Sequence, residues 1–332
     1  MIKHEIKKIT HYEYWSFWVF YIPMIPIYLW MSLRARSLLY FTSTNPGLEH
    51  GGLFNYSKFK LQEQIPLKNR PEHQFLGQKD RENFKVKFEF PFIAKPDFGE
   101  RGKYVDIIEN QKQLDAYLNY NLKDILFQEY IELPLELGLF YARFPHEEQG
   151  KIISITAKKF LYFVGDGKTS LREFIESDSR AYFNKSYLYM KFHDKQELVL
   201  PEGEKIILEE IGNHNRGTYF YDGSDLNSPI LEQKLNEVLK PIDGFYFGRV
   251  DIKTQSLEEL EKGNFKILEI NGSNSEATHV FDENYSLIDA YKEVYRHLKV
   301  QHKIALENIK AGHKPESLKH FIPKLANFLF KA

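Results

Sequence analysis

Two carboxylates and one amide in the last third of the chain are candidates for binding a divalent cation. Asp251 and Glu269 each lie in an apolar, strand-like run, and Asn271 follows Glu269 by two residues. On a strand, residues two apart face the same side. If the two strands are neighbours, three oxygen-bearing side chains converge, a set that suits Mg²⁺ (or Mn²⁺) together with substrate phosphates. The alternative is the polar face of an ordinary antiparallel sheet.

Lysines next to glycine-containing segments are candidates for binding phosphate groups. Lys95 lies at the end of a predicted strand and precedes a loop whose backbone N–H groups could cover phosphates. That loop contains Gly99, Arg101 and Gly102. Lys158 and Lys159 lie on a second predicted strand, before the Gly-Asp-Gly turn at 165–167, and a buried lysine there needs an anionic partner. The pattern leaves open which of these two lysines contacts phosphate.

The segment 128–131 joins two strand-like blocks and could present its backbone to a nucleotide base. Glu136 lies seven residues beyond Glu129, where a carboxylate could accept hydrogen bonds from ribose hydroxyls. The sequence therefore contains candidate residues for binding a base, a sugar, phosphates and a metal.

The elements that must position these residues are short strands with interspersed helices. Strands are predicted at 92–96, 125–131, 139–143, 152–163, 205–210, 246–253 and 265–270, and helices at 111–119, from 171 and at 286–301. Residues 42–71 read as a linker because of their glycines and prolines. This mixture favours an α+β architecture built on antiparallel sheets. Three parts are expected: a membrane-associated segment at 1–44, a catalytic domain at 45–300 and a helical tail at 301–332.

Taken together, the glycine-loop strand, the hinge with its downstream glutamate, Arg-Val-Asp and Glu-Ile-Asn resemble the ATP-grasp superfamily of carboxylate–amine ligases. The resemblance is nearest to D-alanine–D-alanine ligase and cyanophycin synthetase, and it covers about Ser57 to His279. It implies two α+β lobes with antiparallel sheets that hold ATP between them. The chain departs from that family in having an apolar segment where a separate α/β domain usually precedes the lobes. The resemblance therefore implies nothing about the pocket that binds the acceptor substrate.

The resemblance also implies a role for each candidate residue. Phosphates would be bound by Lys58, Lys95, the loop with Gly99, Arg101 and Gly102, and Lys158 or Lys159. The adenine would be held by Glu129, Tyr130 and Ile131, the ribose by Glu136, and Mg²⁺ by Asp251, Glu269 and Asn271. Arg249 would lie over the transferred phosphoryl group or the acyl-phosphate. Arg216 and His214 occupy the place where the ligases stabilise the tetrahedral state, although a loop histidine is more often structural.

The residues from 15 to 33 include no charged side chain, with tryptophan or tyrosine at both ends and basic residues outside them. This matches the interfacial belt of a membrane-inserted element, although about 20 apolar residues are needed to span. Pro23 and Pro26 predict a break in the middle. We therefore expect a helix–break–helix that enters and leaves on the cytoplasmic face of the cell membrane. The alternative is a segment packed on the domain of a cytoplasmic protein.

The composition excludes some kinds of site and disfavours one class of partner. The 332 residues include no cysteine, which excludes thiolate metal sites and cysteine nucleophiles. The formal net charge of −1 and the lack of a basic stripe disfavour nucleic acid as a partner. Near the end of the chain, apolar residues alternate with lysines in the pattern of an interfacial amphipathic helix.

The expected activity is formation of an amide through an acyl-phosphate, with ATP and Mg²⁺, between a carboxylate and an amine of unknown identity. The apolar segment suggests that one substrate is a lipid or lipid-linked. Two alternatives remain: an ATP-grasp phosphotransferase of the kinase type that makes no amide, and a membrane-tethered nucleotide-binding protein without turnover.

Overall fold

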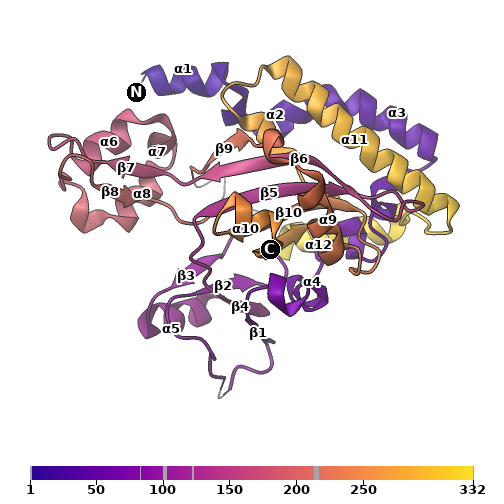
Figure 1. Ribbon diagram of the computed structural model, residues 1–332, viewed down its shortest axis with the longest axis horizontal. Helices are drawn as coiled ribbons and strands as arrows, with labels where there is room; N and C mark the ends of the chain where they lie inside the picture. The colour runs from indigo at the N-terminus through magenta and orange to yellow at the C-terminus, as the bar shows by residue number, and fades with distance from the viewer. Residues whose placement is uncertain (1, 83, 100–102, 122, 213–216, 332) are drawn as a thin grey trace.

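Antiparallel sheets organise the chain. The computed structural model describes residues 2–82, 84–99, 103–121, 123–212 and 217–331, and within them the strands form sheets of four, five and two strands (Figure 1). Helices surround the sheets, so the predicted α+β class with antiparallel sheets is confirmed.

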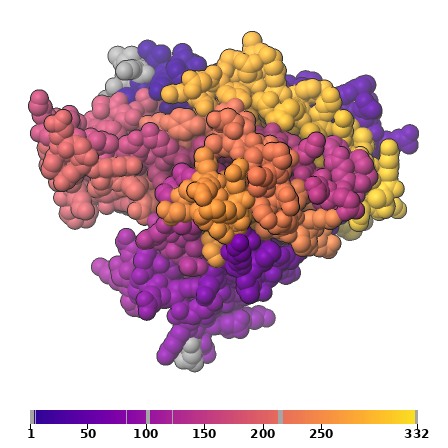
Figure 2. Space-filling view, viewed as in Figure 1, coloured from indigo at the N-terminus to yellow at the C-terminus, as the bar shows by residue number. Residues whose placement is uncertain are grey.

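The four-stranded sheet belongs to a small lobe that projects from the body of the molecule (Figure 2). Its strand order is β1-β4-β2-β3. The elements of this lobe are α4 (Lys58–Gln64), η5 (Leu67–Asn69), β1 (His73–Leu76), β2 (Phe92–Pro96), β3 (Asp106–Ile108), α5 (Gln111–Tyr120) and β4 (Ile125–Glu129). The Asn110 side chain caps α5 by accepting a hydrogen bond from the Gln113 N–H. Leu114 and Tyr117 of α5 then pack on the sheet.

The five-stranded sheet, in the order β11-β10-β5-β6-β9, forms the centre of the large lobe. Its elements are β5 (Leu135–Ala142), β6 (Lys151–Lys159), β9 (Tyr219–Asp222), η8 (Ser224–Leu226), α9 (Pro229–Leu239), β10 (Phe247–Thr254), α10 (Leu257–Glu261) and β11 (Phe265–Asn271). One face of this sheet is apolar and the other carries charged side chains. The two faces follow from the alternation of side chains along each strand.

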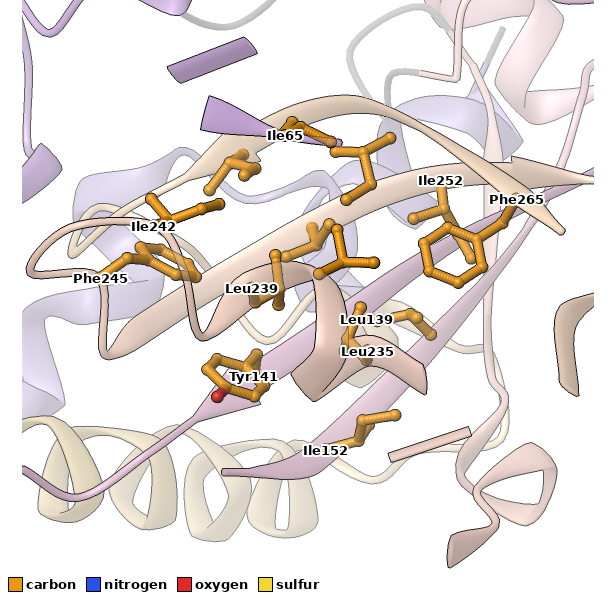
Figure 3. Packing of buried hydrophobic residues seen from close by; sticks show 14 of the residues in the cluster. Ile65, Leu139, Tyr141, Ile152, Leu235, Leu239, Ile242, Phe245, Ile252 and Phe265 are labelled. Carbon is orange, nitrogen blue, oxygen red and sulfur yellow. The ribbon is translucent and has the colours of Figure 1, made fainter. Parts of the chain in front are cut away.

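The apolar face packs against α9 to form the main core (Figure 3). Leu139 and Ile252 of the sheet and Leu235 and Leu239 of the helix are fully buried there. The two leucines are four residues apart and so lie on one side of α9. Their burial fixes the strands whose opposite face carries the charged residues.

A separate group of short elements follows β6. It comprises β7 (Tyr162–Val164), α6 (Leu171–Ser177), α7 (Ser179–Phe183), α8 (Lys185–Lys191), η6 (His193–Lys195) and β8 (Lys205–Ile207). The prediction of one strand over 152–163 was wrong, because the chain leaves the large sheet after Lys159. The Asp166 carboxylate accepts backbone hydrogen bonds from Lys168 and Thr169, so the Gly-Asp-Gly turn serves to lead into α6.

The two ends of the chain are helical and lie along the large lobe (Figure 1). The N-terminal elements are α1 (Ile2–Thr10), η1 (Tyr12–Tyr14), α2 (Phe17–Tyr21), η2 (Ile22–Met24), α3 (Ile25–Ala35), η3 (Tyr40–Ser43) and η4 (Glu49–Gly52), and the C-terminal ones are η9 (Thr278–Phe281), α11 (Leu287–Lys310) and α12 (Leu318–Lys331). The predicted linker at 42–71 therefore contains helical turns and α4. Helix α11 continues well past residue 301 and crosses the predicted boundary at 300.

Candidate active site

The candidate metal ligands lie side by side on the charged face of the large sheet. Strands β10 and β11 pair so that Asp251 is opposite Glu269 and Arg249 is opposite Asn271. Residues directly opposite on one face of an antiparallel pair are close neighbours. The Arg-Val-Asp and Glu-Ile-Asn motifs, whose carboxylates are 18 residues apart in the sequence, thus form one charged patch.

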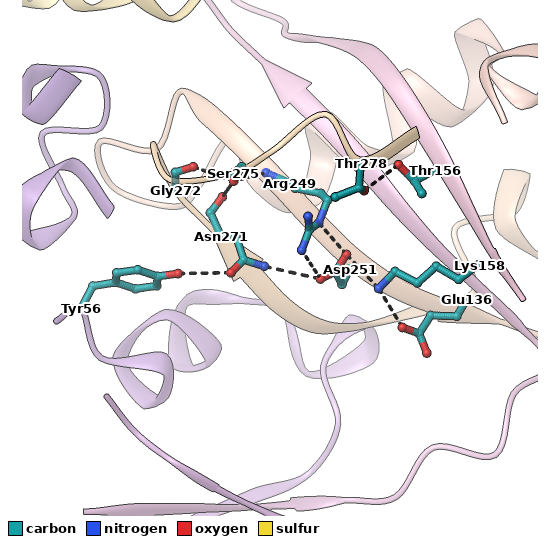
Figure 4. A network of polar contacts seen from close by, with 10 residues as sticks. All are labelled: Tyr56, Glu136, Thr156, Lys158, Arg249, Asp251, Asn271, Gly272, Ser275 and Thr278. Carbon is teal, nitrogen blue, oxygen red and sulfur yellow. Dashed lines mark hydrogen bonds and ion pairs between the residues drawn. The ribbon is translucent and has the colours of Figure 1, made fainter. Parts of the chain in front are cut away.

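A continuous set of polar contacts joins this patch to the next strands (Figure 4). The Arg249 guanidinium holds both carboxylate oxygens of Asp251, at 3.0 Å from Nε and 3.2 Å from a terminal nitrogen. Lys158 Nζ lies 3.3 Å from Asp251 Oδ1 and 2.8 Å from Glu136 Oε1. Asn271 Nδ2 donates to Asp251 Oδ2 at 3.4 Å. Each buried charge therefore has an opposite partner, as burial requires.

The electrostatics keep Lys158 and Asp251 charged. Burial opposes the charge on Lys158, but the carboxylates of Asp251 and Glu136 outweigh it and raise the lysine pKa. Burial likewise disfavours ionised Asp251, yet the neighbouring Arg249 and Lys158 hold its pKa below the ordinary value. The patch is thus a set of fixed charges that is in place before any ligand binds, which is the condition for electrostatic stabilisation of a transition state.

Gly138 of β5 makes room for the arginine–aspartate pair. It lies opposite Asp251 in the neighbouring strand. A Cβ at this position would come 3.1 Å from Arg249 Cδ and 3.2 Å from Asp251 Oδ1. A side chain at residue 138 would therefore displace the groups that the patch depends on.

Two lysines of the small lobe reach across to the large sheet. Lys95 Nζ donates to the Leu268 carbonyl at 3.2 Å. Lys58 Nζ donates to the Gly99 carbonyl and lies 3.6 Å from Glu269 Oε1. Burial lowers the pKa of Lys95 to about 8, because the nearby carboxylate of Glu269 only partly offsets the loss of water. Cations from one lobe and carboxylates from the other thus meet between the lobes.

The predicted adenine segment has several of its polar groups occupied. The Glu129 N–H donates to the Glu72 carbonyl at 2.8 Å, and the Glu129 carboxylate accepts from the Glu72 N–H at 3.0 Å. The Ile131 carbonyl accepts from Lys253 Nζ at 3.0 Å, and the Tyr130 hydroxyl donates to Glu210. These residues line the same cavity as the charged patch. Their contacts with adenine remain predictions.

Lys158 and Lys159, which the sequence could not separate, face opposite sides of β6. Lys158 points into the cavity, whereas Lys159 is exposed and lies over the ring of Tyr162 at 5.1 Å. The predicted ribose ligand, Glu136, is the hydrogen-bond partner of Lys158. Gly99 also lines the cavity. The predicted residues Arg101, Gly102, His214 and Arg216 lie outside the part of the chain that the structure describes.

Sequence reasoning missed some residues that contribute to this site. Lys253 lies two residues beyond Asp251 on the same face and contacts the Ile131 carbonyl from there. Its period-two spacing from Arg249 and Asp251 was a usable signal. Ser275 accepts a hydrogen bond from the Arg249 N–H and donates to the Asn271 and Gly272 carbonyls, contacts that no local pattern predicts.

One large cavity joins the charged patch to the N-terminal helices. Its volume is about 1270 Å³. Single ligands usually occupy pockets of about 300–1,000 Å³, so there is room for more than one. Its lining combines the lysines, Arg249 and the carboxylates with apolar side chains from α2, α3 and α12.

The apolar N-terminal segment packs on the domain along one side and is exposed on the other. Tyr12 donates to the Val280 carbonyl at 2.6 Å, and His302 of α11 contacts the Met31 carbonyl at 3.0 Å. At Pro23, where a break was predicted, the chain forms the 3₁₀ turn η2. The proline is tolerated there because it lies in the first turn of that helical segment. The 19 residues Phe17–Ala35 are, by length and composition alone, long and apolar enough to cross a membrane, which is weak evidence of insertion.

The comparisons with known proteins come from structure alone, since no protein-family profile and no curated protein sequence matches the chain. The D-alanine–D-alanine ligase of Bacillus anthracis is similar with a TM-score of 0.42 and 12% identity, covering 77% of this chain and 69% of that one. A bifunctional glutathione synthetase from Pasteurella multocida gives 0.38 and 15%, over 72% and 36% of the two chains. The VanG D-Ala:D-Ser ligase of Enterococcus faecalis gives 0.40 and 11%, over 78% and 61%.

Two of these structures are ligases by name and one is a synthetase, and the chain is similar to each of them at a TM-score below 0.5. The resemblance to ATP-grasp ligases that the motifs predicted stays a prediction. The chain spans 36% and 61% of the synthetase and the VanG ligase. Identities and TM-scores this low carry no argument about activity or substrates. Both are therefore inferred from the geometry of the site.

Proposed function

We propose that the protein is an ATP-dependent carboxylate–amine ligase that acts at a membrane surface. The observation that carries this proposal is the meeting of Lys58 and Lys95 from one lobe with Asp251 and Glu269 from the other, in one cavity. Lysines near paired carboxylates suit a nucleotide triphosphate bound with a divalent cation, because the cations neutralise phosphate charge. The hinge at residues 128–131 lines the same cavity and supports a place for the base.

The residues present fit Mg²⁺. Glu269 and Asp251 are adjacent carboxylates, and Mg²⁺ in nucleotide sites typically takes one or two carboxylates together with phosphate oxygens and waters. Among the described residues, no group of three or more His, Cys, Asp and Glu could hold a metal without such additional ligands. Binding through Asp251 requires its contact with Arg249 or Lys158 to loosen. When bound, the ion would neutralise charge on the transferred phosphoryl group.

The reaction has two steps. A substrate carboxylate oxygen attacks the γ-phosphorus of ATP, the bond to the β–γ bridging oxygen breaks, and ADP leaves. The nitrogen of an amine then attacks the carbonyl carbon of the acyl-phosphate, phosphate leaves, and the nitrogen loses a proton to give the amide. Arg249 stabilises the charge on the acyl-phosphate, and Lys158 keeps Asp251 in position. No nucleophilic side chain is required, since the protein acts by positioning and charge stabilisation.

The membrane part of the proposal rests on the exposed side of the N-terminal segment. Trp18, Trp30 and Leu33 are 75%, 60% and 70% exposed. Tryptophan and leucine exposed together, next to Arg34, are typical of an element lying in the membrane interface. The charged helix α11 runs beside α3 and contacts it, so a transmembrane position for α3 would carry α11 into the lipid. We infer an interfacial position on the cytoplasmic face of the cell membrane.

Phosphate release from ATP by the full-length protein in lipid vesicles tests the ligase proposal. Pools of amines and carboxylates, with membrane lipid extract, are added to the wild type, to Glu269→Gln and to Glu258→Gln. Glu258 is an exposed glutamate of α10 and serves as the matched control. We expect release that requires both an amine and a carboxylate and falls at least roughly 10²-fold in Glu269→Gln only. A phosphorylated product formed without any amine would instead establish a phosphotransferase. ATP binding without turnover in any pool would favour the nucleotide-binding alternative.

A further inference from the structure

The apolar part of the cavity is formed by three stretches of chain that are far apart in sequence. Its lining includes Phe20, Met24 and Tyr28 from the N-terminal helices, Phe54 from the segment after η4, and Leu325 and Phe328 from α12. Phe54 and Phe328 are in ring contact, with centroids 5.2 Å apart. We call these six residues the apolar arm. The ribose and phosphates of a nucleotide are poorly matched to such a lining, whereas an apolar ligand group is well matched to it.

The arm begins directly beside the charged patch. The Ser273 N–H, two residues beyond Asn271, donates to the Gly51 carbonyl at 3.1 Å. Gly51 and Gly52 have φ of +66° and +80°, and a Cβ on Gly52 would lie 2.7 Å from Gly272 Cα. Glycines therefore allow the end of β11 to touch the segment that leads to Phe54. A ligand lying in the arm would have its polar end next to the phosphoryl-transfer residues.

A second contact ties the N-terminal helices to the patch. Tyr21 of α2 is hydrogen-bonded to Glu276, and burial, with a smaller effect from this carboxylate, raises the tyrosine pKa well above its ordinary value. Glu276 is in turn close enough to Arg249 to favour the charge of the guanidinium. The N-terminal helices are therefore a wall of the catalytic cavity as well as a surface element.

The outer side of the same wall is the exposed apolar surface. Trp18 and Trp30 lie on α2 and α3, and Ile322 and Leu329 of α12 are also exposed. The elements that enclose the arm are thus those that would contact lipid in the proposed interfacial position.

We propose that the apolar arm binds the hydrocarbon chain of a single-chain amphiphile and presents its carboxylate or amine head group to the patch of Arg249 and Glu269. This proposal deepens the ligase function and rests on it for the fate of the head group. The binding itself depends only on the arm. Water leaves the arm when the chain enters, and each buried methylene strengthens binding roughly fourfold.

Photo-crosslinking tests this proposal without turnover. The full-length protein in phosphatidylcholine vesicles is irradiated with hexadecanoic acid, or hexadecylamine, that carries a diazirine near its methyl end. We expect adducts in residues 20–28 and 321–329, saturating near one per protein and suppressed by unlabelled hexadecanoic acid. Leu325→Trp, which fills the arm, is expected to lower labelling at least fivefold. Ile322→Trp, on an exposed position of the same helix, is the matched control and is expected to leave it within twofold.

Two outcomes would overturn the proposal. One is labelling that never saturates and is confined to the exposed residues of α3, which would show bulk lipid only. The other is equal labelling of both tryptophan variants with wild-type thermal melting. The saturation measurement uses the wild type alone, so an unfolded variant does not leave the question open. Saturable labelling without amide formation would refute the ligase function but support ligand binding in the arm. Amide formation on water-soluble substrates without labelling would support the ligase function but refute ligand binding in the arm.

Discussion

Replacing Lys158 by methionine isolates the contribution of the buried charges to folding. Lys158 bridges Glu136 and Asp251, and the three side chains are only 3%, 6% and 9% exposed. The methionine leaves the Glu136 carboxylate buried without its partner, while Asp251 keeps Arg249. Removing one member of a buried ion pair typically costs about 3–5 kcal/mol. Because Asp251 retains a cation, we expect the lower end, a loss of about 3 kcal/mol in the free energy of unfolding.

Denaturant unfolding followed by far-ultraviolet circular dichroism measures this loss. Lys159→Met is the matched control, since it changes the same residue type one position along, on the exposed side of β6, and should stay within about 0.5 kcal/mol of the wild type. Adding Glu136→Met to Lys158→Met removes both members of the pair, and most of the stability should return. Equal losses for the two single lysine variants, or no recovery in the double variant, would refute the assignment of the bridge.

Three further outcomes follow from other parts of the site. Because burial lowers the pKa of Lys95 to about 8, its charge is lost as the pH rises through that value; affinity for a fluorescent ATP analogue should fall above pH 8, and Lys95→Arg should remove this dependence. Gly138→Ala places a Cβ 3.1 Å from Arg249, so phosphate release should fall at least roughly tenfold, measured at saturating ATP. Trp18→Ser with Trp30→Ser should lower vesicle binding several-fold in a flotation assay, and unchanged flotation would contradict the interfacial position.

Much of the large sheet could be predicted because its strands carry their own signal. The run around Asp251 alternates apolar and polar residues, which assigns Arg249, Asp251 and Lys253 to one face. In the run around Glu269 the alternation is interrupted at Ile267 and Leu268, where the pairing register shifts. Pairing between the strands is not local, so the contact of Lys253 with the Ile131 carbonyl, 122 residues away, could not be predicted. Only the three-dimensional arrangement separates Lys158 from Lys159 by their surroundings.

Other elements were missed for different physical reasons. Helix α9 has a clear start signal, with Ser228 as the cap and Pro229 in the first turn, and the pattern was overlooked rather than absent. Strand β9 is short and aromatic, and it forms only by pairing with β6. The segment around Gly51 appears as a loop in sequence because its backbone turns need positive φ, and its close approach to Gly272 depends on the whole fold.

The position of the N-terminal helices also bears on how the chain is made. Tyr12 and Met31 contact residues 268 and 271 positions further along, so these partners are synthesised long after the apolar segment. At about 5–20 residues per second, the apolar segment waits roughly 10–50 s before α11 exists to cover it. If the protein acts at a membrane as proposed, the bilayer can cover this segment during that time. We expect folding to be completed on the membrane, and the yield of soluble protein made without lipid to be low for kinetic reasons even if the finished fold is stable.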